Sequence, residues 1–109
     1  MKDDFRLEFD RALERIDTAY AELLRLGGRT CDGFREEGDC LKCGLGTYEG
    51  YDIVLSVSGE GSSIYANTNC HYPSLYVMKD VLPNLKNVAK NLEIEVKNLK
   101  EVVRTAEAA

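Results

Sequence analysis

The sequence lacks any apolar run close to the roughly 20 residues that a helix needs to cross a bilayer. Its start, MKDDFRLEFD, is charged and lacks the apolar core of a secretory signal. Internal repeats and low-complexity linkers are absent as well. These absences argue against a membrane protein and predict one domain for the 109 residues. We therefore expect a cytoplasmic protein, in which cysteine thiols stay reduced.

Residues typical of catalytic sites are also scarce. The chain has one histidine, His71, and it has neither a phosphate-binding glycine loop nor a nucleophile elbow. Zinc deaminases carry a His-x-Glu element upstream of a Cys-x-x-Cys pair, and no such element precedes Cys40. The net charge of −5 argues against a general nucleic-acid binder. We therefore expect a non-enzymatic protein without catalytic residues.

Two segments have the periodicity of amphipathic helices. In residues 3–26, apolar side chains recur every three or four positions, and Gly27-Gly28 supplies a stop. Residues 74–106 carry a similar stripe, in which Pro83 either kinks one helix or begins a new one. Because each segment has a single apolar stripe and the two stripes are similar in length, we expect the helices to pack antiparallel.

Between these helices the sequence changes to strand-like alternation. Residues 50–69 alternate apolar and polar side chains around the turn sequence GEGS, which predicts an antiparallel β-hairpin. Residues 29–47 are rich in cysteine and glycine, and we expect a loop there. The predicted fold class is α+β: a long N-terminal helix, a zinc-knuckle loop, an antiparallel hairpin and a long C-terminal helix packed antiparallel on the first.

The most informative motif lies in that loop. The segment CLKCG, which starts at Cys40, resembles the knuckle of zinc ribbons and rubredoxin-like sites, in which two thiolates grip one ion from a tight turn. The resemblance covers five residues and implies two ligands. Cys31 lies close before the knuckle and Cys70 follows the second arm of the hairpin, so both can return to it. We expect a structural zinc held by Cys31, Cys40, Cys43 and Cys70, with His71 as the alternative fourth ligand.

Other uses of the four cysteines stay open. Disulfides, a redox pair, unconnected thiols and an iron–sulfur cluster fit the same count. A redox pair begins a helix, whereas Gly44-Leu45-Gly46 is poor helix sequence. Four thiolates leave no position for water, so an enzyme with an open zinc site of three thiolates is the less expected interpretation.

Charged stripes flank both helical segments. The basic side chains of the second segment fall on one face, which suits either a solvated flank or phosphate binding. In an antiparallel pair, an acidic stripe on the first segment would face them and form interhelical ion pairs. The acidic stripe comprises Asp3, Asp10, Glu14 and Asp17, and the face that would bind nucleic acid in the alternative comprises Lys86, Lys90, Lys97 and Arg104.

Tyrosine is concentrated in and around the hairpin. Alternation places Tyr65 on the face opposite Ile64, together with two asparagines. Tyrosine beside adaptable amides suits protein recognition, and the acidic residues of the loop 32–39 would border the patch. We expect a partner surface comprising Tyr65, Asn67, Asn69, Glu36 and Glu37.

The sequence therefore predicts a zinc-stabilised protein-interaction module that acts as a small adaptor, regulator or inhibitor of another protein. Its apolar stripes also leave room for a second copy of the chain, so a homo-oligomer is a further expectation. The alternative is a nucleic-acid-associated zinc protein that uses the basic face of the second helix, and an enzyme with an open zinc site comes last.

Overall fold

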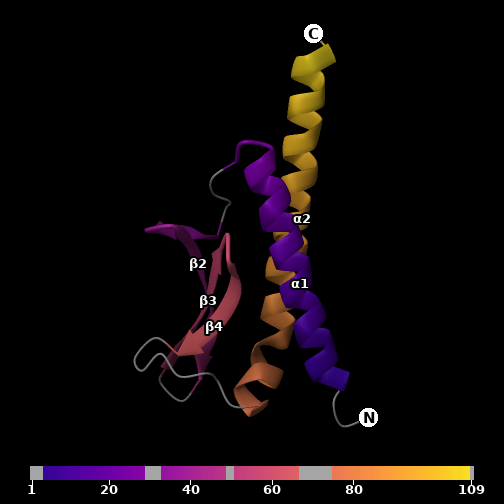
Figure 1. Cartoon of the computed structure of the whole chain (residues 1–109). Helices are drawn as coiled ribbons and strands as arrows, with labels where there is room; N and C mark the ends of the chain where they lie inside the picture. Colours follow the sequence, from indigo (N-terminus) through magenta and orange to yellow (C-terminus); the bar gives the residue numbers. More distant parts are fainter. Residues whose placement is uncertain (1–3, 29–32, 49–50, 67–74, 109) are drawn as a thin grey trace.

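The computed structural model describes residues 4–28, 33–48, 51–66 and 75–108. Two helices lie on one face of a four-stranded antiparallel sheet (Figure 1), so the predicted α+β class is confirmed. Within the described residues, neither helix is long and apolar enough to cross a membrane. The elements are α1 (Asp4–Arg25), β1 (Arg35–Glu37), β2 (Cys40–Tyr48), β3 (Tyr51–Ser58), β4 (Gly61–Ala66) and α2 (Leu75–Ala108).

Helix α1 forms where apolar periodicity predicts it. Phe9, Ile16 and Leu23 recur at heptad spacing and are buried on one face. The helix ends in a Schellman motif, in which the Gly28 N–H donates to the Leu23 carbonyl at 2.9 Å and Gly27 has a φ of 87°. This left-handed conformation favours glycine because any other side chain is strained there. The predicted glycine stop is therefore confirmed.

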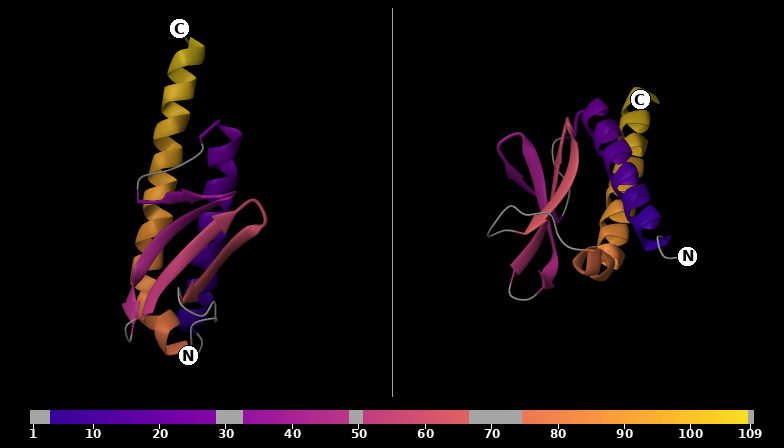
Figure 2. Two further views of the ribbon diagram at one scale, coloured as in Figure 1. Left: turned by 90° about the vertical axis from the view of Figure 1, so that its left-hand side faces the viewer. Right: turned by 60° about the horizontal axis from the view of Figure 1, so that its bottom comes forward.

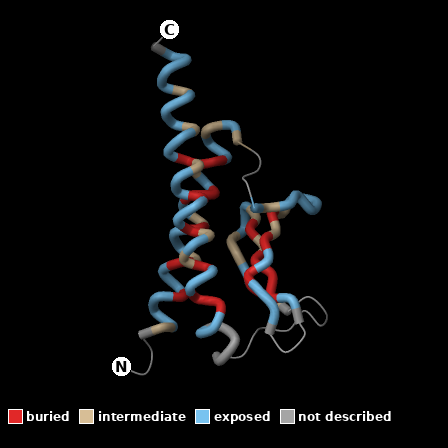
Figure 3. Tube along the Cα trace, turned by 180° about the vertical axis from the view of Figure 1, so that it is seen from behind, coloured by how far each residue is buried: buried red, intermediate tan, exposed pale blue. Residues whose placement is uncertain are grey.

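The sheet has the strand order β1-β2-β3-β4, and all neighbouring pairs are antiparallel. Strands β3 and β4 occupy the predicted hairpin, with the turn at Gly59 and Glu60. One face of the sheet is apolar and packs on the helices, where buried segments from both layers face each other (Figure 3). The buried side chains on this inner face are Leu41, Cys43, Leu45, Ile53, Leu55, Val57 and Ile64.

The predicted cysteine-rich loop is wrong, because much of this segment forms β1 and β2. Along β2, Leu41, Cys43 and Leu45 are buried, whereas Lys42 and Gly44 are not. This alternation is typical of a strand with one face on the core. Cysteine takes the place of a small apolar residue in it. Strand β2 is hard to recognise from the sequence, because two cysteines at this spacing also fit a metal-binding knuckle.

Helix α2 is continuous through Pro83, whose side chain is exposed. The sequence left open whether this proline kinks one helix or begins another, and the structure has a single helix. Directly after the proline, the Asn84 Nδ2 atom donates to the Leu45 carbonyl at 2.5 Å. Leu45 lies at the β-bulge that shifts the register of β2 between Gly44 and Gly46. The Asn84 amide therefore fastens α2 to the sheet at this bulge.

The two helices run parallel, so the predicted antiparallel packing is wrong. In Figure 1 both helices run from the end of the molecule that carries the N-terminus to the end that carries the C-terminus. Ion pairs between them repeat every seven residues on both helices, and the partners keep a constant separation of 78 residues. A constant separation requires parallel chains. The pairs are Glu8–Lys86 at 2.7 Å, Arg15–Glu93 at 2.5 Å and Glu22–Lys100 at 3.3 Å.

The number of strands determines this direction. A two-stranded hairpin would return the chain to the end where α1 finishes, and the second helix would then run back antiparallel. Instead β2, β3 and β4 cross the sheet one after another, so that α2 begins beside the start of α1 (Figure 2). Of these three strands, β2 is the one that the sequence did not predict. The prediction of antiparallel helices rests on the similar lengths of two single apolar stripes, and these carry no information about direction.

The interface between the helices follows a parallel heptad register. The three ion pairs flank it, and the core between the helices includes Ala12 and Ala19 of α1 and Leu85 and Leu92 of α2. All four side chains are buried in one cluster. Small side chains of α1 thus share this closely packed core with larger side chains of α2.

Zero-length carbodiimide cross-linking should detect the direction of the helices. Because the ammonium and carboxylate groups are already in contact, we expect amide bonds between Lys86 and Glu8 and between Lys100 and Glu22. Tandem mass spectrometry of the digested monomer identifies them. Cross-links between Lys100 and Glu8, or between Lys86 and Glu22, would instead require antiparallel helices and would contradict the register.

Candidate functional site

The two described cysteines lie on β2 as free thiols. Cys43 is buried in the core opposite Leu55, and Cys40 is only partly buried opposite Glu37. Residues three positions apart on a strand point to opposite faces, so the strand directs the two thiols away from each other. In this arrangement Cys40 and Cys43 do not form the tight turn that would let them grip one ion.

The surroundings of Cys43 are those of an apolar core residue. Burial raises the pKa of its thiol, and the charge of Arg35 opposes this only in part. The thiol donates weakly to the Gly44 carbonyl at 3.5 Å. Since zinc binds the thiolate, a buried and protonated thiol is a poor ligand until β2 opens.

The other predicted ligands, Cys31, Cys70 and His71, lie outside the described residues. Within the described part of the chain, no three histidine, cysteine, aspartate or glutamate side chains converge on a point that could hold a metal ion. The four-thiolate zinc site therefore stays a prediction. It now requires the segment from Cys40 to Cys43 to leave the strand conformation.

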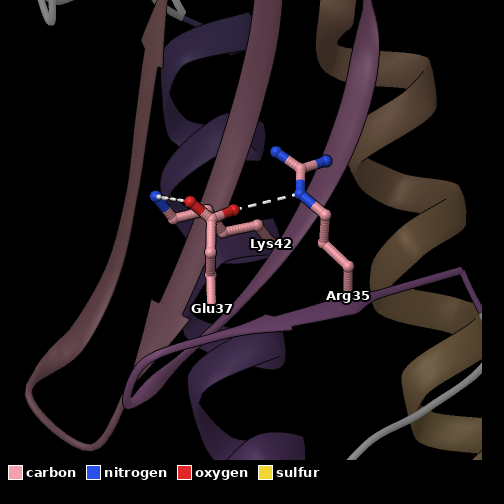
Figure 4. Close-up of polar contacts among 3 residues, drawn as sticks. All are labelled: Arg35, Glu37 and Lys42. Carbon is pink, nitrogen blue, oxygen red and sulfur yellow. Dashed lines mark hydrogen bonds and ion pairs between the residues drawn. The ribbon is translucent and has the colours of Figure 1, made fainter.

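A polar cluster occupies the outer face of the sheet, away from the helices. We call Arg35, Glu37, Lys42 and Tyr65 the outer cluster. The Glu37 carboxylate accepts from Arg35 Nε at 3.0 Å and from Lys42 Nζ at 3.5 Å (Figure 4). The Lys42 ammonium lies 5.3 Å from the centre of the Tyr65 ring, which is the distance of a cation–π contact. Three strands thus contribute to one connected surface.

The strand register explains how these side chains meet. Arg35 pairs with Lys42 across β1 and β2, which places both on the same face. Tyr65 pairs with Val54, and Val54 pairs with Gly44. Because Gly44 has no side chain, β2 leaves the space beside Val54 unoccupied. Tyr65 can therefore reach diagonally across β3 to Lys42.

Electrostatics favour the charged forms of this cluster. The hydrogen bond from Arg35 and the charge of Lys42 lower the pKa of Glu37. A hydrogen bond with Tyr65 is the largest cause that raises the pKa of Lys42. For Glu37 the stabilisation is present above the usual glutamate range and is lost as the pH falls through the lowered pKa. Both side chains are solvated, so we expect this contribution to stability to be small.

The predicted partner surface is only partly assembled. Tyr65 lies on the face opposite Ile64, as alternation predicts. Glu37 belongs to the outer cluster, but Glu36 pairs with Leu41 and lies on the other side of the sheet. There Glu36 lines a separate cavity with residues of α1 and the β1–β2 turn. The other two predicted residues, Asn67 and Asn69, lie outside the described residues.

Sequence reasoning missed Arg35 and Lys42. The available signal was alternation: Arg35 and Glu37 are two residues apart, as are Cys40 and Lys42, and each pair shares a face of a strand. The signal was overlooked because the segment was interpreted as a loop, in which side chains have no common face.

The charged stripes of the helices also differ from the prediction. The interhelical ion pairs use Glu8, Arg15 and Glu22 rather than the acidic stripe, because parallel packing turns a different flank of α1 toward α2. Within the described part of that stripe, Asp17 instead lies near the β3–β4 turn. On the predicted nucleic-acid face, Lys86 contacts Glu8, Arg104 contacts Glu101 at 2.8 Å, and Lys90 and Lys97 are exposed.

The chain matches no known protein family, no curated protein and no solved structure.

Proposed function

We propose that the chain is a non-enzymatic protein-interaction module that binds a protein partner through the outer cluster. The observation that carries the proposal is the Lys42–Tyr65 contact, which is tied through Glu37 to Arg35. Tyrosine and arginine are among the residue types that are enriched where binding energy concentrates at interfaces. The proposal concerns the kind of function and leaves the identity of the partner to experiment.

Preorganisation supports this choice of surface. The cluster stands on paired strands, and each charged side chain is already held by a neighbour of opposite charge or by an aromatic ring. A partner would therefore immobilise few freely rotating side chains, which lowers the entropic cost of binding. The helices cover the other face of the sheet, so the outer cluster is not needed to build the main core.

The experiment is affinity capture with Tyr65→Ser and with Ile94→Ser as the matched control. Both positions lose a large side chain, but Ile94 is an exposed residue of α2 that is remote from the outer cluster. We expect Tyr65→Ser to reduce the recovery of specific protein partners at least about tenfold, as a hot-spot residue should. Quantitative mass spectrometry measures the recovery, and thermal unfolding verifies that both variants fold.

Two outcomes would contradict the proposal. In one, Tyr65→Ser retains every partner that the native chain captures. In the other, the captured molecule is a nucleic acid whose binding falls steeply with salt, as the alternative based on Lys86, Lys90, Lys97 and Arg104 requires. Two of those four side chains already contact carboxylates, which reduces the charge that this face offers to phosphates.

The predicted zinc is a separate proposal. The interaction surface is built without any cysteine ligand, since Cys40 and Cys43 do not belong to the outer cluster. Thiol labelling, described in the Discussion, distinguishes a core thiol from a zinc ligand.

A further inference from the structure

The two edges of the sheet are protected to very different extents. Strand β1 is three residues long, and all three of its residues are charged and exposed. Strand β4 has six residues, GSSIYA, with neither charge nor proline, and among the described strands it pairs only with β3. Every second residue of an edge strand directs its N–H and C=O away from its neighbour. Strand β4 is therefore the edge to which another strand can be added (Figure 2).

A cavity adjoins the beginning of this edge. It has a volume of about 410 Å³ and lies between α1 and the β3–β4 turn. The α1 side combines a carboxylate with apolar surface, whereas the end of β3 contributes a hydroxyl and the turn a second carboxylate. The lining residues that determine this chemistry are Asp17, Tyr20 and Leu24 on α1, Ser58 at the end of β3, and Glu60 on the turn.

Negative charge at this cavity lacks a described counter-charge. The Asp17 Oδ1 atom is buried, and no described residue donates a hydrogen bond to it. The Ser62 Oγ atom, at the second residue of β4, is likewise buried without a described partner. Glu60 adds a second carboxylate at the turn. Buried acceptors of this kind are costly unless a donor reaches them, and a cationic donor makes the strongest such bond.

We propose that β4 accepts an extended, basic segment of a partner protein as a fifth strand, with a lysine or arginine side chain in the cavity between Asp17 and Glu60. The bound segment would satisfy the outward backbone groups of β4, and its cationic side chain would face the unpaired carboxylate. This inference deepens the proposed function. It rests on that function only because it assumes that the partner is a protein.

The spacing of the acidic groups on α1 is compatible with the spacing of side chains along an added strand. Asp10 precedes Asp17 by two helical turns on the same flank of α1, which is about 10.5 Å along the helix axis. Side chains on one face of a strand recur about every 6.7 Å, so two or three inward-facing residues of an added strand would lie along this acidic flank. The outward-facing residues would lie beside Tyr65, where an apolar side chain is favourable.

A second copy of the chain is a poorer occupant. Strand β4 contains no basic residue, so its pairing with β4 of another copy would supply no cation for the cavity. Symmetric pairing would also leave the Asp17 and Glu60 carboxylates of both copies without a cation, in an assembly of two chains that each have a net charge of −5. Like charges at an interface are unfavourable, and the charge pattern therefore selects a basic partner.

The probe for this inference is an octapeptide of alternating lysine and valine, blocked at both ends. Titration of the isotope-labelled full chain, followed by amide NMR, should place the largest shifts in β4 and at the β3–β4 turn. Amide hydrogen exchange on alternate residues of β4 should slow when the peptide is bound. A peptide with the same composition but with its lysines in one block is the matched control for charge alone.

Charge variants test the cavity. We expect Asp17→Asn combined with Glu60→Gln to weaken binding of the alternating peptide at least about tenfold, because it removes both carboxylates that face the lysine. Asp10→Asn alone should have a smaller effect. Glu107→Gln removes one negative charge from an exposed residue near the end of α2 and should leave the affinity unchanged.

Three results would overturn the inference: equal binding of the block peptide, amide shifts centred outside β4, or unchanged affinity in the double variant. The variant Arg35→Ser separates this inference from the proposed function, because it disrupts the outer cluster at the opposite edge of the sheet. We expect Arg35→Ser to retain the alternating peptide. If no peptide binds while Tyr65-dependent capture of a protein persists, the strand-addition site alone is wrong.

Discussion

Replacement of Leu85 by alanine should lower the free energy of unfolding by about 3 kcal/mol. Leu85 has an exposed fraction of 0% and lies in the cluster that joins both helices to the sheet. The same cluster includes Ala12 and Ala89, whose small side chains can fill little of the space that the substitution leaves. The loss therefore combines the transfer free energy of the removed methyl and methylene groups with the cost of a cavity. Urea unfolding followed by circular dichroism measures it.

The matched control is Ile94→Ala on the same helix. Ile94 is 46% exposed, so its truncation should change the free energy of unfolding by less than about 0.5 kcal/mol. Similar losses in both variants would show that helix propensity rather than packing explains the effect. A loss below about 1 kcal/mol for Leu85→Ala would contradict the packing between α1 and α2.

Thiol labelling should distinguish Cys40 from Cys43 by a large factor. Cys43 is 9% exposed and burial raises its pKa, so both access and thiolate content are low, whereas Cys40 is partly exposed. We expect iodoacetamide to modify Cys43 at least roughly a hundredfold more slowly than Cys40, since reaction at Cys43 requires local opening. Trypsin cleaves after Lys42 and separates the two cysteines, so mass spectrometry can follow each rate.

The same experiment tests the predicted zinc. If the structure as described holds, a chelator such as EDTA should leave both rates unchanged, and urea should make them equal. If Cys31, Cys40, Cys43 and Cys70 share one zinc, both measured thiols should react slowly, and both should become fast after chelation. That outcome would support the zinc site and would contradict the strand conformation of β2 at these residues.

The helices were predictable because their signals are local. The apolar periodicity of α1 and the glycines that end it determine its course, and the single stripe of α2 outweighs Pro83. The alternation of β3 and β4 is equally clear. Strand β2 was missed because its inward positions include Cys43, and because Gly44 and Gly46 are typical of loops. In the structure these glycines flank a bulge, which is a tertiary feature that composition does not reveal.

The candidate site was less predictable for a related reason. Tyr65 could be placed on its face from alternation within a single hairpin. Glu36 and Glu37 could not be distinguished, since the side that each faces depends on pairing with a strand that was not predicted. The contacts of Lys42 with Glu37 and Tyr65 join residues on three strands, and their register is set by pairing rather than by local sequence.

Parallel packing of α1 and α2 has an electrical consequence. The peptide dipoles of a helix sum to about half a positive charge at its N-terminal end and half a negative charge at its C-terminal end. In an antiparallel pair these dipoles would largely cancel, but here they point the same way and add. The antiparallel sheet contributes little of its own. The molecule is therefore polar along its length, and near a highly charged surface it will experience a torque that aligns its long axis independently of its net charge.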